Sequence, residues 1–130
     1  MQILLQPAKS KTCWAHCISM VTEVPVAKIL EMAGHSHSAN FKEVAEIMIK
    51  LGYPKASRKY RPFFYQKELP KLCFLCLSWK GRGAHLVVYN DGKIYCPGKG
   101  IYDYNLKNID KQEVKAKYYL YIGEKSEEAK

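Results

Sequence analysis

The chain has 130 residues, which fits one domain, and 48% of them are hydrophobic, which argues against a disordered chain. No apolar run approaches the roughly 18 residues of a membrane span, and the opening residues turn polar and basic too soon for a secretory signal. We therefore expect a cytoplasmic protein without membrane contact. The net charge of +9 indicates an acidic protein, nucleic acid or an anionic cell wall as partner, with solubility alone as the plain alternative.

The cysteine pattern and the absence of nucleic-acid motifs narrow these options. Neither an RNA-binding aromatic signature nor a helix-turn-helix pattern stands out, so nucleic acid is not the favoured partner. The five cysteines are odd in number and do not suggest a disulfide framework. A reducing compartment and one cysteine with a special role are the simpler interpretation.

The first half of the chain predicts helices. Apolar residues at helical spacing indicate a helix from Cys13 to about Thr22. A second helix is expected from about Val26 to Met32, ended by Gly34, and a third from Phe41 to Leu51. The basic and aromatic stretch 55–67 is interpreted as a loop with room for one edge strand, and it would form a solvated rim beside a cleft.

The second half predicts strands. The expected strands are Leu72–Trp79, His85–Tyr89, Lys93–Cys96 and Tyr118–Ile122, with a hairpin turn at Asn90-Asp91-Gly92. Helices followed by strands indicate an α+β fold in which N-terminal helices pack on an antiparallel β-sheet. We expect one domain over residues 1–122 and a charged, flexible tail over 123–130.

Cys13 is the first candidate for chemistry. At the start of a helix, free amide N–H groups and the helix dipole favour an anion, so its thiol pKa is expected to fall. The plain alternative is a small buried apolar residue. Cys13, His16 and Cys17 also have a spacing that could hold a metal, with His35 or His37 as a further ligand, but this interpretation is not favoured.

Two further residues suit a thiol nucleophile. His85 begins a core strand after the small residues Gly83 and Ala84, which leave room for a substrate, and it could act as general base, although a structural histidine is the plain alternative. Gln6 could donate a hydrogen bond to the oxygen that gains charge in acyl transfer, together with the Cys13 backbone N–H.

The order of these parts resembles the papain-like cysteine peptidases, most of all the small peptidases that remove double-glycine leaders from bacteriocins. The resemblance runs from Gln6 to Tyr102 through the segments CWAHCISMVT, FKEVAEIMIKLGY, LCFLCLSW and AHLVVYNDGKIYCPGKG. It implies a papain-like fold, a peptide or protein substrate, which the basic charge predicts to be acidic, and neither cofactor nor metal. Cys13 would attack the carbonyl, His85 would take the thiol proton, and Trp14 would lie beside the cleft.

The sequence departs from that family at three points. Trp14 follows the nucleophile where the family has glycine, and the Gln6-to-Cys13 spacing is about one residue longer. Cys96 takes the place of the aspartate that orients the histidine. If Asn90 pairs with Lys93, the residue beside His85 comes from positions 96–98, whereas Asp91 at the hairpin tip lies about 20 Å away at roughly 3.3 Å per residue.

These departures leave three functions open. The leading one is a cysteine peptidase working with a Cys–His dyad, as an effector or phage-encoded protein in a bacterial host. A cell-wall endopeptidase resembling the NlpC type is the second, because those enzymes also place His-apolar-Tyr-Asp-Gly on a hairpin. A pseudo-peptidase that binds a protein partner is the third, with Cys96 as its main support.

Overall fold

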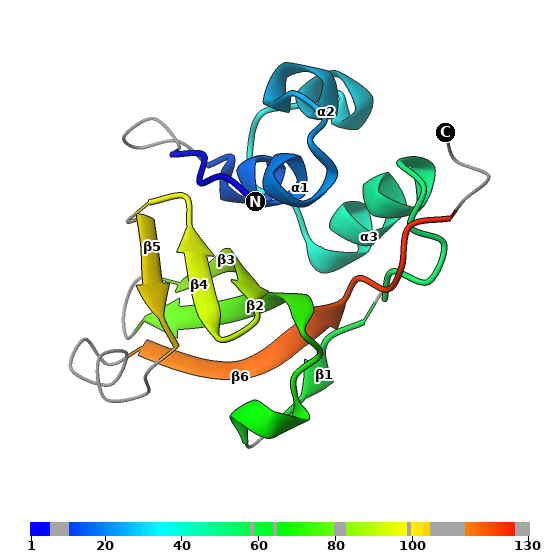
Figure 1. Cartoon of the computed structure of the whole chain (residues 1–130). Helices are drawn as coiled ribbons and strands as arrows, with labels where there is room; N and C mark the ends of the chain where they lie inside the picture. Colours follow the sequence, from blue (N-terminus) through cyan, green and yellow to red (C-terminus); the bar gives the residue numbers. More distant parts are fainter. Residues whose placement is uncertain are drawn as a thin grey trace.

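A mixed α+β fold is present, as predicted. The computed structural model describes residues 1–5, 11–57, 59–63, 65–79, 83–98, 100–104 and 114–126. These residues form three α-helices, one short 3-10 turn (Gln66–Glu68) and a six-stranded antiparallel sheet (Figure 1). No helix within these ranges has the length and apolar character needed to cross a membrane.

The helices begin and end close to the predicted residues. They are α1 (Cys13–Thr22), α2 (Val26–Ala33) and α3 (Phe41–Lys50). Gly34 ends α2 with a φ of 77°, a left-handed conformation that glycine adopts without a Cβ clash. Asn40 begins α3, because its side chain accepts a hydrogen bond of 2.9 Å from the Glu43 backbone N–H.

The sheet has the order β1-β6-β2-β3-β4-β5. Its strands are β1 (Arg61–Pro62), β2 (Leu72–Trp79), β3 (Gly83–Asn90), β4 (Lys93–Cys96), β5 (Gly100–Asp103) and β6 (Val114–Tyr121). The expected edge strand is β1, and the expected hairpin turn joins β3 to β4, with positive φ angles of 48° at Asp91 and 87° at Gly92. Three strands differ from the prediction: β3 begins at Gly83 instead of His85, β5 was not predicted, and β6 begins at Val114 instead of Tyr118.

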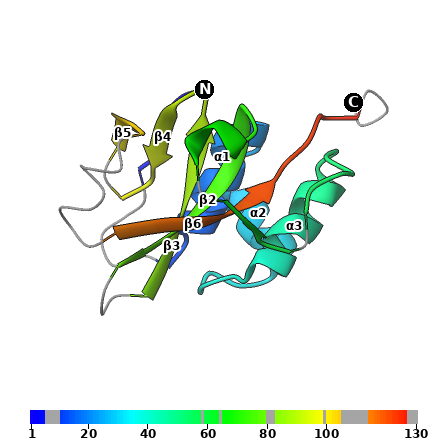
Figure 2. The ribbon, with the colours of Figure 1, turned by 90° about the horizontal axis from the view of Figure 1, so that it is seen from below.

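Two apolar clusters hold the fold together, one on each face of the sheet, because alternate residues of a strand point to opposite faces. On one face, Phe74 and Leu86 pack with Ile18 of α1, which is fully buried. On the other face, Leu75 and Val87 pack with further residues of a second cluster: Phe63, Cys73, Leu77, Tyr89, Ile94 and Cys96. The helices lie on the same side of the sheet in Figure 1, and strands lie over α1 in the view from below (Figure 2).

The end of the described chain returns to the helical layer. Ile122 is fully buried, and the Ser126 backbone N–H donates a hydrogen bond of 2.7 Å to the Gly52 carbonyl. The predicted flexible tail began at Gly123, so its first residues, through Ser126, are instead held against the turn that follows α3. Residues 127–130 lie outside the described ranges.

Candidate active site

Cys13 and His85 line the same small pocket, which has a volume of about 90 Å³. The pocket lies between the start of α1, the segment that leads into α3, and the sheet. Its apolar walls come from Ala39, Phe41, Val44, Leu86 and Leu120, and its polar lining comes from Lys11, Ser38, Tyr60 and Cys76. Both residues that the sequence proposed as nucleophile and base therefore line one pocket.

Burial has the largest effect on the pKa of the thiol of Cys13, the first residue of α1. Burial raises its pKa above the ordinary value, and the nearby Cys76 thiol raises it further. Backbone groups of Leu86, Trp14 and Cys13 itself lower the pKa but do not outweigh burial. The sequence prediction of a lowered pKa was therefore wrong in sign, because other chain segments bury the start of the helix. Forming a thiolate here requires a neighbouring group that stabilises its charge.

The imidazole of His85 lies beside Cys96. The distance from Cys96 Sγ to His85 Nε2 is 3.4 Å, and Cys96 is 1% exposed. The segment after Cys96 stays close, since a Cβ built on Gly98 would lie 3.8 Å from the same Nε2 atom. The partner of His85 therefore comes from the positions that hairpin counting indicated, and it is a thiol instead of a carboxylate.

The remaining predicted residues fall into three groups. Trp14 lines the pocket but is only 2% exposed, so it can offer a substrate no more than part of its ring surface. Gly83 and Ala84 are the first residues of β3, which begins two residues before the expected strand start at His85, and their predicted contact with a substrate stays a prediction. Gln6 lies outside the described residues, so its predicted place in the oxyanion hole stays a prediction.

Sequence reasoning did not place Cys76 or Tyr60 at the pocket. Cys76 of β2 pairs with Leu86 of β3 and lines the pocket, where the hydroxyl of Tyr60 donates a hydrogen bond to its sulfur. Burial raises the pKa of both groups. The sequence predicted core packing for Cys73 and Cys76 on opposite faces, and Cys73 is indeed fully buried in the second cluster. The alternation in β2 placed Cys76 on the face of Phe74, a signal that could have assigned it to the helical side.

The alternative metal site gains no support from the geometry. Within the described ranges, no group of three or more histidine, cysteine, aspartate or glutamate residues could hold a metal ion. The ring of His16 contacts the Thr12 carbonyl at 2.8 Å, and the Cys17 thiol donates to the Leu86 carbonyl at 3.2 Å. All five cysteines are free thiols. The helical spacing of His16 and Cys17 therefore serves packing contacts.

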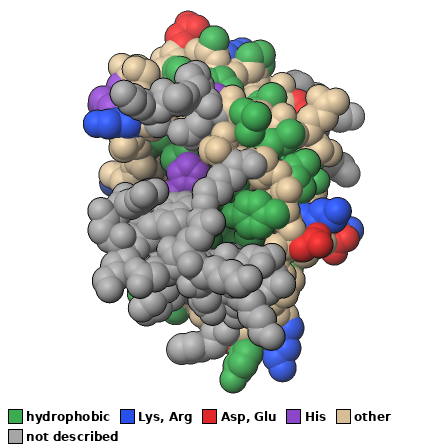
Figure 3. All heavy atoms as spheres, turned by 90° about the vertical axis from the view of Figure 1, so that its left-hand side faces the viewer, with side chains coloured by type: hydrophobic (Ala, Val, Ile, Leu, Met, Phe, Trp, Pro, Cys, Tyr) green, Lys and Arg blue, Asp and Glu red, His purple; other side chains and the backbone are tan. Residues whose placement is uncertain are grey.

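Figure 3 shows the face on the left of Figure 1, where a histidine side chain reaches the surface beside apolar side chains. An imidazole on this face is therefore open to solvent.

The chain matches no protein-family model and no curated protein, so its function has to be inferred from the geometry of the pocket.

Proposed function

We propose that the protein is a papain-like cysteine peptidase that cleaves a peptide or isopeptide bond. The observation that carries this proposal is that Cys13, at the start of a helix, shares a pocket with His85, whose Nε2 atom contacts Cys96. A thiol at a helix start, an imidazole on a facing strand and a third group on the far ring nitrogen form the arrangement that activates a cysteine nucleophile.

The reaction begins with proton transfer from the Cys13 thiol to Nδ1 of His85, since Nε2 faces Cys96. The thiolate attacks the carbonyl carbon, and a C–S bond forms while the carbonyl oxygen gains charge. The backbone N–H of Cys13 and the side chain of Gln6 stabilise that oxygen. The imidazolium then donates its proton to the departing amine, and the C–N bond breaks. Water, giving its proton to His85, hydrolyses the resulting thioester and regenerates Cys13.

Burial makes the thiol depend on its partner. Because burial raises the pKa of Cys13, the thiol on its own would be almost entirely protonated at neutral pH. The His85 imidazolium, at the same pocket, would favour the charged form. The site is therefore expected to be inert without His85, which makes the histidine the sharpest point at which to test the proposal.

The pocket also indicates the kind of substrate. Its volume of about 90 Å³ exceeds the roughly 10–15 Å³ that a single water molecule needs, and Phe41, Val44 and Leu120 supply apolar surface. A small aliphatic side chain next to the scissile bond fits this space. Lys11 at the same pocket and the net charge of +9 favour an acidic peptide segment nearby.

Cys96 supports one alternative. A neutral thiol stabilises an imidazolium less well than a carboxylate does. A catalytically degenerate domain would keep the pocket and bind a protein partner without cleaving it. The two functions differ in the reactivity of one cysteine.

The deciding experiment is the pH dependence of iodoacetamide labelling at each cysteine, measured by mass spectrometry in wild type and in His85→Ala. We expect Cys13 to label faster at pH 7 than the other four cysteines, and the variant to lose this behaviour. Cys73, buried in the second cluster, is the internal control for folding, because it stays unlabelled while the protein is native. Slow labelling of Cys13 that does not depend on His85 would overturn the peptidase and favour the binding domain.

A further inference from the structure

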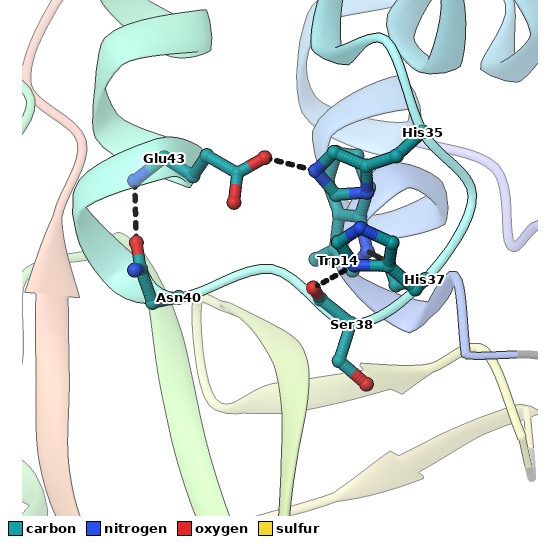
Figure 4. Close-up of polar contacts among 6 residues, drawn as sticks. All are labelled: Trp14, His35, His37, Ser38, Asn40 and Glu43. Carbon is teal, nitrogen blue, oxygen red and sulfur yellow. Dashed lines mark hydrogen bonds and ion pairs between the residues drawn. The ribbon is translucent and has the colours of Figure 1, made fainter.

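Figure 4 shows a cluster of rings that includes Trp14, the residue after the candidate nucleophile. Trp14 follows Cys13 in the chain, and its ring lies 5.6 Å from that of His35, centroid to centroid. The ring of His37 stacks on His35 with centroids 3.7 Å apart and an interplanar angle of 8°. The peptidase chemistry proposed above uses none of these histidines, so their arrangement needs its own explanation.

The cluster fixes one wall of the pocket. The Trp14 indole N–H donates a hydrogen bond of 2.9 Å to the His37 carbonyl, and Ser38 and Ala39 line the pocket directly after it. We call residues 35–39 the rim segment. It has no helix or strand of its own, so its shape depends on side-chain contacts.

Glu43 of α3 holds the first residue of this segment. Its carboxylate pairs with Nε2 of His35 (Figure 4), and its backbone N–H is bound by Asn40 at the start of α3. The His35 side chain is 17% exposed, and its Nδ1 atom is buried and has no hydrogen-bond partner in the described part of the chain. Removing the carboxylate charge would weaken the polar contact that this ring makes. A buried imidazole without hydrogen-bond partners is destabilised, so we expect the ring to move toward solvent.

We propose that Glu43, acting through His35, is a positioning residue: it fixes the rim segment against Trp14, so that the pocket wall beside Cys13 is already formed when a peptide arrives. This inference rests on the proposed peptidase function. A preformed wall spares the substrate the cost of ordering a loop on binding, and it holds the scissile bond near the thiol. Glu43 itself touches no reacting atom.

The test compares Glu43→Gln with the matched control Glu46→Gln, an exposed glutamate one turn further along α3. Two reagents label Cys13: iodoacetamide, which needs only the thiol, and the chloromethyl ketone of acetyl-Gly-Leu-Ala, which has a small aliphatic side chain next to the reactive carbonyl and must also lie along the rim segment. In Glu43→Gln we expect the iodoacetamide rate to stay within about twofold and the peptidyl rate to fall about fivefold or more. Glu46→Gln should change neither rate. An unchanged ratio of the two rates in Glu43→Gln overturns the inference.

A second variant separates the polar pair from the packing of the rings. His35→Phe keeps a ring against Trp14 but loses the bond to Glu43, so it should lower the ratio as Glu43→Gln does. The double variant should lower the ratio no further, because both changes remove one interaction. A normal ratio in His35→Phe would show that ring packing is sufficient, which also overturns the inference.

A spectroscopic readout keeps the inference separate from the peptidase proposal. The chain has two tryptophans, so Trp79→Phe assigns the Trp14 indole resonance in a ¹⁵N–¹H NMR spectrum. In Glu43→Gln this resonance should shift and its proton should exchange faster with water. If Cys13 of the wild type reacts with neither reagent, the peptidase proposal has failed. The positioning role is then judged on the indole alone, and an unchanged indole overturns it.

Discussion

Replacing Cys96 by aspartate should make Cys13 more reactive. Cys96 lies 3.4 Å from His85 Nε2, the position from which a carboxylate could stabilise the imidazolium. Coulomb's law at this distance and an effective dielectric constant of about 20 gives about 5 kcal/mol of attraction. Most of that is offset, because position 96 is 1% exposed and burying a carboxylate costs several kcal/mol.

A hydrogen bond to a charged group is stronger than a neutral one by about 1 kcal/mol or slightly more, and we expect a net stabilisation of the imidazolium of this size. This corresponds to a fivefold to tenfold larger population of the thiolate–imidazolium pair, at about 1.4 kcal/mol per tenfold. We therefore expect Cys96→Asp to raise the rate of Cys13 alkylation at pH 7 by about fivefold to tenfold. The same variant should melt at a lower temperature, because it buries a new charge.

The assay is the pseudo-first-order rate of iodoacetamide labelling at Cys13, followed by mass spectrometry alongside a thermal melt. Cys96→Asn is the matched control: it has the shape of aspartate without the charge and should raise the rate by less than about twofold. If Cys96→Asp folds and labels no faster than Cys96→Asn, the charge at position 96 does not reach Cys13 through His85. If the aspartate variant does not fold, a rate in Cys96→Asn more than tenfold below wild type would refute the reasoning that a polar side chain at position 96 supports His85.

Three further predictions concern the rest of the fold. Ile18→Ala, at a fully buried site between α1 and the sheet, should lower the free energy of unfolding by about 2–5 kcal/mol in urea titration. Gly92→Ala should lower it by about 1 kcal/mol or more, because φ is 87° in the β3–β4 turn, and an unchanged urea midpoint would contradict this. Burial raises the pKa of Cys73 and of Tyr102 to about 12 each, so the native state holds these protons more tightly than the unfolded state. Stability should therefore fall as pH rises from the ordinary values toward 12, and the Cys73→Ala variant should lose less stability over that range than wild type.

The elements that sequence analysis located are those whose signals are local. The apolar spacing from Cys13 to Thr22 and the left-handed glycine at 34 act within one helix, and the Asn90-Asp91-Gly92 turn fixes the register of its own hairpin. Counting along that hairpin also indicated the neighbourhood of His85. Each of these features depends on residues close in the chain.

The parts that were missed depend on segments far apart. β5 (Gly100–Asp103) alternates between half-buried and exposed residues and is a strand because β4 pairs with it. The sign of the Cys13 pKa shift depends on which segments cover the start of α1, and Tyr60 enters the pocket from a loop without periodicity. The alternation of β6 from Val114 onward was present in the sequence, but Lys115 and Lys117 interrupt its apolar character, so no strand was predicted before Tyr118.

The position of β6 bears on how the chain folds as it is made. β6 is the last strand that the structure describes, yet it lies between β1 and β2 and pairs with both. Leu120 and Ile122 then complete the apolar cluster under the helices. A nascent chain that has not yet reached Val114 has an unpaired edge on β2 and an incomplete core, so it is prone to aggregate. The C-terminal strand therefore closes the fold, and its long-range pairing is expected to set the folding rate.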